Sequence, residues 1–343
     1  MRRHEGFKSV GELRSKLREI VPSHVYYSTA IYEKPEEEMD AKEWLGADLF
    51  FDIDADHIPT PCNKEHDTWS CNCGETGKGI PPETCPKCGG SKVDDKSWVC
   101  EVCLESAKRE TTKLIDMLFR DFGFSPGEIE VAFSGHRGYH ITLEALGVRG
   151  LDQIARREIV DYVTGIGFEP KFHGLEDASV PSLEEGGWRG RIARGTYEFL
   201  LNTNAERLTE IGFRKNDGVW KIKGVGLKNW NKIMQKAIEN QTVKIDTVVT
   251  TDIHRLIRLA DTLHGKTGLK KVIVPISNID SFDPLKSAVA FKGGAVTLIV
   301  SEAPEFRLGD GRYGPFKNAE VELPTAAALF LLCKGAAKLK ETN

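Results

Sequence analysis

The chain has 343 residues, of which 40% are hydrophobic and 29% are charged. This balance is ordinary for a folded globular protein, and the length allows one large domain with an insertion or two domains. The formal net charge of -4 excludes a generally basic nucleic-acid coat, although a local basic groove remains compatible with it. The charged N-terminus carries no apolar signal region, and the longest apolar run, Ala326–Cys333, is too short to span a bilayer. These features predict a cytoplasmic protein.

Apolar periodicity predicts the elements of the first half of the chain. An amphipathic helix is expected over residues 8–20, and a short apolar strand over Ala47–Ile53 runs into carboxylates. A second helix is expected over Ala107–Phe122. Two strands, Glu128–Phe133 and Tyr139–Leu143, flank a glycine-containing hairpin.

The second half alternates helical patterns with basic loops from residue 151 to about 240. Beyond it the pattern predicts a strand over Val243–Val249, a helix over Asp252–Leu259, a strand over Lys271–Ile276 and a helix over Pro324–Lys340. The order of elements predicts an α/β or α+β fold. Residues 150–240 are expected to form a helical insertion within one catalytic domain that spans residues 1–343.

Two acids stand at the end of the first predicted strand. The period of two places Asp52 and Asp54 on one face and Ile53 on the other, with the two Cα atoms roughly 6–7 Å apart. Oxygen ligands at this spacing suit hard divalent cations, and a pair of such cations can promote phosphoryl chemistry. A third acid, Asp246, lies in another apolar segment. The alternative is a strand end that reaches solvent through an aspartate-rich turn.

Phosphate-binding side chains are grouped at two places. The segment Ser134–His140 offers a hydroxyl, an arginine and two histidines around two glycines. Arg255 and Arg258 are expected on one helix face, ahead of the donor-rich turn Leu263–Gly268. These groups suit a triphosphate, whereas the alternative is a set of solvated charges. No Walker A loop is present, because Ala260 occupies the position where that motif needs glycine.

Seven of the eight cysteines lie between Cys62 and Cys103. In a cytoplasmic chain this clustering indicates metal binding, and with His66 the eight ligands would serve two tetrahedral zinc ions. One pairing is nested, with an outer set Cys62, His66, Cys100 and Cys103 and an inner set Cys71, Cys73, Cys85 and Cys88. The other joins Cys85, Cys88, Cys100 and Cys103 in one ribbon. Closed sites of either kind are structural. Cys333 is expected to be a buried thiol.

Taken in order, these motifs resemble the small, catalytic subunit of archaeal and eukaryotic DNA primases. The resemblance rests on Phe51-Asp-Ile-Asp-Ala55, Val99-Cys-Glu-Val-Cys-Leu104, Ser134-Gly-His-Arg-Gly-Tyr-His140, Ile245-Asp246, His254-Arg-Leu-Ile-Arg258 and Leu263-His-Gly-Lys-Thr-Gly268. It implies the archaeo-eukaryotic primase fold: a mixed-sheet catalytic core, a helical insertion and a zinc-binding projection at residues 60–104.

The resemblance also implies roles for the site residues. Asp52, Asp54 and Asp246 would hold Mg²⁺ or Mn²⁺. The incoming nucleotide's phosphates would be bound by Ser134, Arg137, His140, Arg258, His264 and Lys266. The family's zinc knuckle matches the outer set, which favours the nested pairing, with residues 71–88 as an inserted second ribbon.

The implied activity is template-directed synthesis of short RNA, and possibly DNA, primers from NTPs or dNTPs on single-stranded DNA. The implied partner is the large primase subunit in a heterodimer, and no membrane is involved. Template phosphates are expected on Arg189, Arg191 and Arg194. Alternatives are a repair-type primase-polymerase that extends ends, a two-metal nuclease and a non-catalytic zinc-ribbon adaptor.

The sequence departs from the family pattern at two places. Ala260-Asp-Thr262 stands where the family often has Pro-Gly-Ser, which places Asp261 near the expected phosphate pocket. His136 stands where arginine or asparagine is common in the family.

Overall fold

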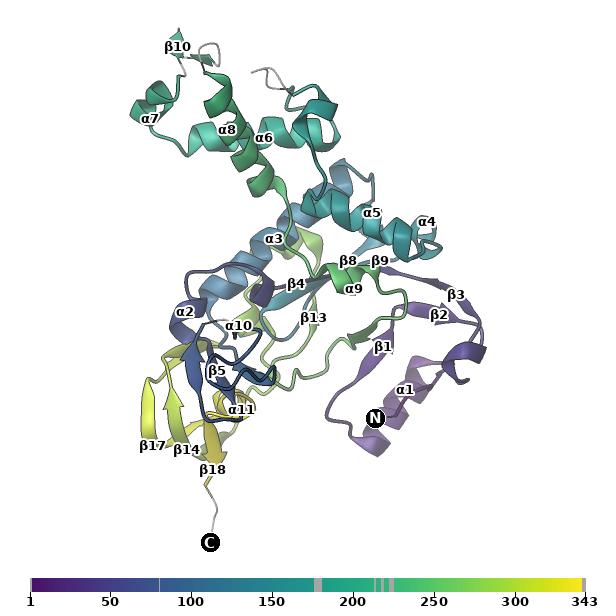
Figure 1. Cartoon of the computed structure of the whole chain (residues 1–343). Helices are drawn as coiled ribbons and strands as arrows, with labels where there is room; N and C mark the ends of the chain where they lie inside the picture. Colours follow the sequence, from purple (N-terminus) through teal and green to yellow (C-terminus); the bar gives the residue numbers. More distant parts are fainter. Residues whose placement is uncertain are drawn as a thin grey trace. The chain divides into compact units, whose positions relative to one another are not determined.

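The computed structural model describes residues 2–79, 81–175, 181–212, 214–216, 219–221 and 225–340. The chain forms two compact units (Figure 1). The larger unit comprises Met1–Thr111, Gly127–Arg156 and Ile245–Asn343, and the smaller unit comprises Thr112–Pro126 and Arg157–Lys244. The chain therefore leaves the larger unit twice and returns to it twice.

A four-stranded sheet forms the centre of the larger unit. Its order is β13 (Val272–Ile273), β8 (Ile129–Phe133), β9 (Gly138–Leu143) and β4 (Leu49–Asp54). Phe51, Ile53 and Tyr139 are fully buried in its core. The α/β (α+β) fold class is confirmed. Each neighbouring pair in this sheet is antiparallel, where the resemblance implied a mixed sheet.

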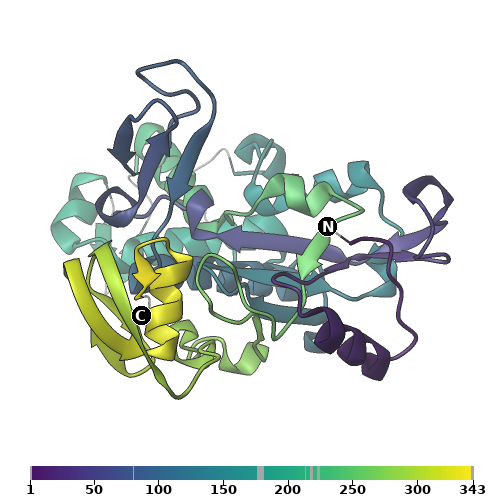
Figure 2. The same ribbon diagram turned by 90° about the horizontal axis from the view of Figure 1, so that it is seen from below.

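Smaller sheets and short helices surround the central sheet (Figure 2). The paired strands are β1 (Tyr26–Ser28) with β12 (Leu256–Arg258), β2 (Ala30–Tyr32) with β3 (Trp44–Ala47), and β15 (Phe306–Leu308) with β16 (Gly311–Tyr313). The three-stranded sheets are β6 (Thr76–Lys78), β5 (Thr68–Cys71) and β7 (Val93–Lys96), and β17 (Phe316–Pro324), β14 (Ala295–Ala303) and β18 (Ala337–Leu339). The short helices are α2 (Asn63–His66), α4 (Leu146–Arg149), α9 (Thr247–Thr251), α10 (Pro284–Ser287) and α11 (Thr325–Cys333).

Several predicted elements are confirmed. Helix α1 (Val10–Ile20) begins after Ser9, whose side chain caps it by accepting a hydrogen bond from the Glu12 amide. Strands β4, β8 and β9 lie where periodicity placed them. Helix α3 (Glu101–Arg120) begins six residues earlier than expected, because Cys103 lies in its first turn rather than in a loop, and Cys100 immediately precedes the helix.

Two elements predicted around Asp246 are wrong. Residues 243–246 form no strand. The Asp246 carboxylate accepts hydrogen bonds from the amides of Val248 and Val249, and so starts α9. The helix expected over Asp252–Leu259 is a turn followed by β12, because Leu256–Arg258 pair with β1. Pairing with a strand more than 200 residues away left no local signal.

The C-terminal predictions were too long. Helix α11 ends at Cys333, where Gly335 adopts φ +65° and stops it. The residues that follow form β18, which pairs with β14. Only Val272–Ile273 of the expected strand 271–276 form a strand. Cys333 is partly rather than fully buried.

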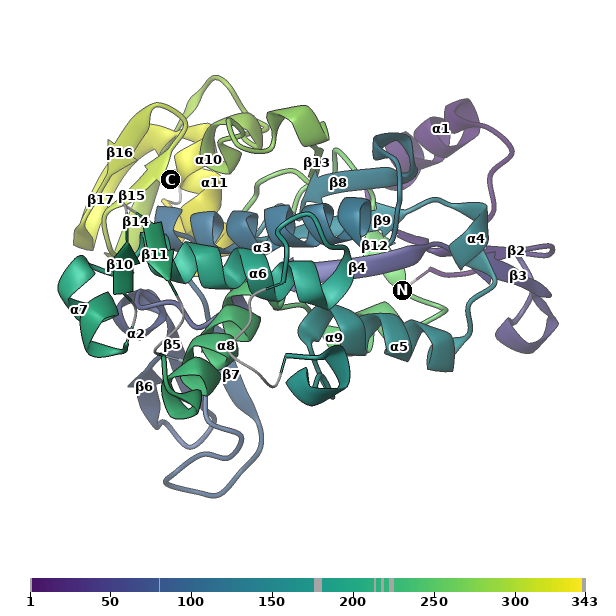
Figure 3. The same cartoon turned by 90° about the horizontal axis from the view of Figure 1, so that it is seen from above.

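The smaller unit contains a helical core (Figure 3). Its elements are α5 (Gln153–Thr164, which begins in the larger unit), α6 (Gly187–Leu201), α7 (Ala205–Glu210), α8 (Leu227–Gln241) and the hairpin β10 (Arg214–Asn216) with β11 (Val219–Lys221). Helices α6 and α8 lie side by side, and Trp188, Ile192 and Trp230 are buried between the elements of this unit. None of the helices in the described ranges is both long and apolar enough to cross a membrane.

The smaller unit corrects one expectation about template binding. Arg191 is 1% exposed and is ion-paired with Asp121 and, at 3.3 Å, with Asp116. It therefore cannot reach template phosphates. The Arg189 guanidinium donates to Glu185 at 2.6 Å and to the His173 carbonyl, so it too has partners within this unit.

Candidate active site

The three predicted metal-binding acids come together at the end of β4. Asp52 faces His140 across the β4–β9 ladder. The Asp246 amide donates to the Asp52 carbonyl at 2.9 Å, which fixes the start of α9 beside the strand. Burial, followed by repulsion from Asp54 and Asp246, raises the pKa of Asp52 to about 7. Such mutual repulsion is relieved when a divalent cation binds.

The Asp54 carboxylate is oriented by one hydrogen bond and one longer electrostatic contact. Its Oδ1 accepts a hydrogen bond of 3.0 Å from the Asp56 amide, and its Oδ2 lies 4.0 Å from His136 Nδ1. Burial would raise the pKa of Asp54, but the imidazole of His136 and then the charge of Arg137 lower it below its usual value. Asp54 is therefore held as an anion beside Asp52.

A cavity of about 250 Å³ opens next to these acids. The predicted site residues that line it are Asp52, Asp54, Ser134, His140, Arg258 and His264. Tyr26, His136 and Arg255 line it as well. Asp246, Arg137 and Lys266 are not part of its lining. The cavity is therefore lined both by acids and by hydroxyl, imidazole and guanidinium groups.

Arg258 and His264, which both line the cavity, are held in place by contacts with their neighbours. Its guanidinium donates to the Leu263 carbonyl at 2.8 Å and to the Tyr26 hydroxyl at 3.0 Å. The His264 ring stacks on His136, with centroids 5.1 Å apart. Burial, then the charges of His136 and Arg258, lower the pKa of His264 to about 3, so this ring is neutral at pH 7. A neutral imidazole can donate one hydrogen bond to a phosphate oxygen.

His140 faces the acids from β9. Its Nε2 lies 3.7 Å from Asp52 Oδ1. Burial, then the charge of Lys271, lower the pKa of His140 well below its usual value. Its Nδ1 is buried and has no hydrogen-bond partner among the described residues. Nδ1 is therefore an unsatisfied buried polar atom, and Nε2 is the ring nitrogen that faces Asp52.

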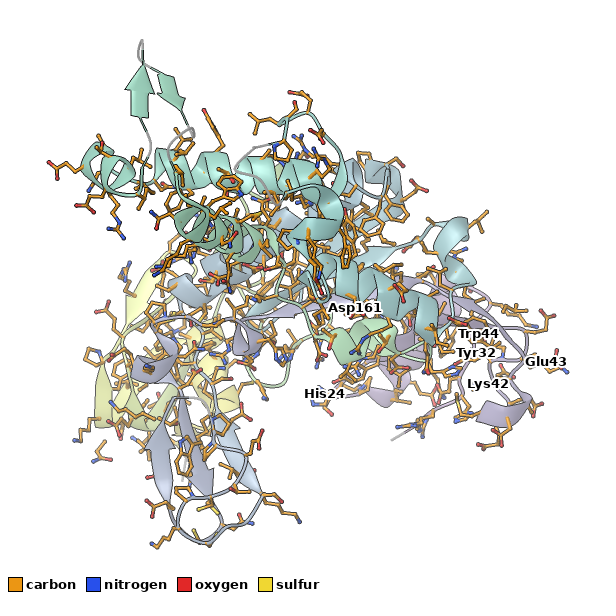
Figure 4. All side chains as sticks on the ribbon, turned by 45° about the horizontal axis from the view of Figure 1, so that its top comes forward. His24, Tyr32, Lys42, Glu43, Trp44 and Asp161 are labelled. Atoms are coloured by element: carbon orange, nitrogen blue, oxygen red, sulfur yellow. The ribbon has the colours of Figure 1, made fainter. Side chains whose placement is uncertain are left out.

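The turn that carries Arg255 is held by contacts with Tyr32 of β2 and with Thr29. Figure 4 labels Tyr32. The Tyr32 ring stacks on His254 with centroids 6.1 Å apart, and its hydroxyl is 2.9 Å from His254 Nδ1. The Arg255 carbonyl also accepts from the Thr29 amide at 2.9 Å. These contacts place the Arg255 side chain at the cavity wall.

Two glycines make the β8–β9 hairpin possible. A Cβ on Gly138 would lie 2.2 Å from the Ile53 carbonyl oxygen, so only glycine lets β9 approach β4 this closely. Gly135 has φ +87° and lies against His264 and the Leu269 carbonyl. The hairpin and the Leu263–Gly268 turn therefore meet at the cavity.

Arg137, a predicted phosphate-binding residue, points away from the cavity. Its Nη1 donates to both oxygens of Asp67, at 3.0 and 2.8 Å, and to the Trp98 carbonyl at 3.1 Å. It is also ion-paired with Asp56. Arg137 therefore joins the strand that carries Asp54 to the segment that carries His66.

Replacing Arg137 with alanine should lower the free energy of unfolding by roughly 3–5 kcal/mol, because the buried Asp67 carboxylate loses its guanidinium and, among the described residues, keeps only the His66 ring and the Trp98 amide as partners. Denaturant unfolding of Arg137→Ala against wild type measures this loss. A paired variant, Arg137→Met with Asp67→Asn, should recover much of it. An Arg137→Ala protein of wild-type stability whose KM for nucleotide is raised would instead support direct phosphate contact.

Lys266 is exposed. Its ammonium lies 3.7 Å from Asp95 of β7, and its amide donates to His264 Nδ1 at 3.2 Å. The lysine backbone thus helps to orient the His264 ring, while the side chain extends toward the cysteine-bearing strands.

The eight metal-binding candidates form two groups. In each group the ligand atoms all lie within 4.8 Å of one another: Cys62, His66, Cys100 and Cys103 form one, and Cys71, Cys73, Cys85 and Cys88 form the other. The grouping is that of the nested pairing. His66 Nδ1 is 2.7 Å from Asp67, which leaves Nε2, 3.2 Å from Cys100 Sγ, for a metal. Four soft or borderline donors per group fit zinc.

Two lysines, the buried Lys271 and the half-buried Lys334, were missed by the sequence analysis. Lys271 is 1% exposed. Burial lowers its pKa to about 8; Glu130 and Asp52 oppose this shift, and Arg258 adds to it. Lys334 donates to the Ser97 carbonyl at 2.9 Å and lies 3.3 Å from His136 Nε2. Neither stands in a motif. The only signal was a single lysine at the end of the apolar C-terminal run.

Comparison with known proteins identifies the family. A family model described as DNA primase small subunit matches residues 89–277. The DNA primase small subunit PriS of Cenarchaeum symbiosum (strain A) is 35% identical over 98% of this chain and 88% of its own length. The PriS of Methanothrix thermoacetophila is 35% identical over 99% of this chain and 89% of its own length. The PriS of Archaeoglobus fulgidus is 34% identical over 98% of this chain and 86% of its own length. The chain belongs to the DNA primase small subunit family.

Proposed function

We propose that this chain synthesises short primers on single-stranded DNA by metal-dependent nucleotidyl transfer. The observation that supports it is the single cavity that Asp52 and Asp54 line together with His140, Arg258 and His264. Carboxylates suit catalytic cations, and the guanidinium and imidazole groups suit the triphosphate of an NTP or dNTP. In the reaction, a 3′-hydroxyl attacks the α-phosphorus and pyrophosphate leaves.

Each group of site residues would have its own role in this reaction. Asp52, Asp54 and Asp246 would hold Mg²⁺ or Mn²⁺, which when bound would lower the pKa of the attacking hydroxyl and balance charge on the leaving group. Arg258 and His264 would orient the phosphates, with Ser134 and His140 supplying further hydrogen bonds. No protein nucleophile is required. The two cysteine groups would hold structural zinc.

The proposal includes the partners and location of the protein. The family name implies a large primase subunit, with which this chain would form a heterodimer on a single-stranded DNA template. The matched relatives named above are archaeal. The chain would act in the cytoplasm, where the DNA template lies.

Primer synthesis on circular single-stranded DNA without a primer tests the function. With Mn²⁺ and labelled ATP or dATP among the four nucleotides, we expect short labelled products that grow with time. A repair-type primase-polymerase would give products only when a primer is added. A two-metal nuclease would degrade the circle, and a zinc-ribbon adaptor would yield nothing in any of these reactions.

His264 should matter more for nucleotide use than Lys266, because His264 lines the cavity and Lys266 does not. Losing one hydrogen bond to a charged phosphate typically costs about 1.5–3 kcal/mol, so the KM for NTP in His264→Ala should rise roughly 10- to 150-fold. Lys266→Ala should show a smaller rise. NTP titrations measure both, and filter binding should show unchanged affinity for single-stranded DNA.

Lys270→Ala is the matched control, because Lys270 belongs to the same segment but pairs with Asp261 at 2.9 Å. It should keep the wild-type KM. If His264→Ala lost DNA binding and retained its KM for NTP, the turn would face the template and the proposed nucleotide pocket would be misplaced.

A further inference from the structure

A half-buried lysine stands directly behind the histidine that faces Asp54. Lys334 is the C-cap of α11, and its side chain reaches the segment between β7 and α3, where it donates to the Ser97 carbonyl at 2.9 Å. Its second contact, at 3.3 Å, is with Nε2 of His136. Among the described residues no carboxylate forms an ion pair with this ammonium.

The contact with Lys334 selects the tautomer of His136. An ammonium has donors and no acceptor, so the Nε2 that it meets must accept. A ring whose Nε2 accepts from an ammonium is neutral, because an imidazolium donates from both nitrogens. A neutral ring that accepts at Nε2 carries its proton on Nδ1. Ser97 Oγ also lies near Nε2, at 3.4 Å, but a hydroxyl can donate or accept and does not fix the tautomer.

The protonated Nδ1 is the nitrogen that faces Asp54. It lies 4.0 Å from Asp54 Oδ2, a distance at which the attraction is electrostatic rather than a full hydrogen bond. Two further contacts hold the ring in this orientation. Its face stacks on His264, and its backbone amide donates to Ser134 Oγ at 3.2 Å. The ring therefore presents a fixed N–H dipole to one oxygen of the carboxylate.

We propose that Lys334 is a positioning residue of the active site: it holds His136 as the Nδ1–H tautomer, and His136 in turn orients the Asp54 carboxylate. The inference rests on the proposed function, since it assigns Asp54 to the catalytic metal. Outer donors of this kind set the direction in which a carboxylate offers its lone pairs. Burial, then the charges of Arg137 and Lys266, lower the pKa of Lys334 to about 7, so the measurements below are made at pH 6, where the side chain is mainly an ammonium.

The alternative is that Lys334 only docks α11 onto Ser97. A double-mutant cycle separates the two roles. Lys334→Met should lower kcat about tenfold, raise the Mn²⁺ concentration needed for half-maximal activity and leave the KM for NTP nearly unchanged, while Lys334→Arg should recover most of kcat. In a His136→Asn background, Lys334→Met should change kcat less than twofold. Equal losses in both backgrounds, or no loss in either, would overturn the proposal.

A measurement independent of activity reads the tautomer itself. With ¹⁵N-histidine labelling, the neutral His136 ring should show its proton on Nδ1 in the wild type, and Lys334→Met should shift it toward Nε2. The His136 signal is identified by its absence from His136→Asn. Lys338→Met, an exposed lysine on β18, is the control and should change nothing.

The outcomes are distinguishable. A Nε2–H ring in the wild type, or a tautomer unaffected by Lys334→Met, refutes the role of Lys334 whatever the enzyme does. A wild-type chain that shows the Nδ1–H tautomer but incorporates no nucleotide refutes the proposed function instead. Thermal unfolding of each variant checks that the fold is intact.

Discussion

Each of the single substitutions Asp52→Asn, Asp54→Asn and Asp246→Asn should lower the kcat of nucleotide incorporation by roughly a thousandfold or more. Charge stabilisation by a bound cation is worth several kcal/mol, and each 1.4 kcal/mol is a factor of ten in rate. Asparagine keeps the size of the side chain but removes the charge that the cation needs. Incorporation of labelled nucleotide at saturating NTP and Mn²⁺ measures the effect.

Asp261→Asn is the matched control for these substitutions. Asp261 is exposed and lies outside the cavity lining, and its φ of +60° is a conformation that asparagine also tolerates. It should retain wild-type incorporation. If any of the three inner variants were as active as this control, the metal assignment would be wrong.

The same acids predict how stability depends on pH without added Mg²⁺ or Mn²⁺. The folded-state pKa of Asp52, about 7, lies above its ordinary value of 3.8. Between these two values the folded protein holds a proton that the unfolded chain has released, so this site loses stability as pH rises toward 7. The Asp52→Asn protein should therefore unfold at a higher temperature than wild type at pH 7.5 and at a similar temperature at pH 4. Adding Mn²⁺ should raise the wild-type value by mass action.

The sequence was most informative where a local pattern decides the structure. Strand alternation placed Asp52 and Asp54 on one face of β4, and two glycines marked the hairpin that meets it. For the eight zinc-ligand candidates the spacing left two pairings open, and the nested one that the resemblance favoured is the grouping in the structure.

The sequence was least informative where a distant partner decides. Asp246 stands in a β-branched run that suggests a strand, but its carboxylate caps α9 and its amide bonds to Asp52. Arg258 reaches the cavity from β12, whose partner is β1 near the N-terminus. Arg137 lies in a segment that was predicted to bind phosphate, but its guanidinium donates hydrogen bonds to the buried Asp67. No single-sequence pattern records such long-range pairings.

Loss of the outer metal site should be far more damaging than loss of the whole inner ribbon. Cys103 is fully buried, and its site is joined to the active site through His66, Asp67 and Arg137. Cys103→Ser should therefore lose one of two zinc ions, unfold at a lower temperature and lose most nucleotide incorporation. Elemental analysis, thermal unfolding and the primer assay measure the three effects.

Excision of the ribbon supplies the contrast. Thr68 and Lys96 are cross-strand partners in the β5–β7 pair, so deleting residues 69–95 and joining the two ends through Asn-Gly should close the strands with a tight turn. The product keeps the complete outer set together with Ser97 and Trp98, on which Lys334 and Arg137 depend. It should carry one zinc ion and incorporate nucleotide at close to the wild-type rate. A zinc-free excised protein would instead favour one ribbon made of Cys85, Cys88, Cys100 and Cys103. The deletion removes two ligands of that ribbon, whereas it removes none from the outer set.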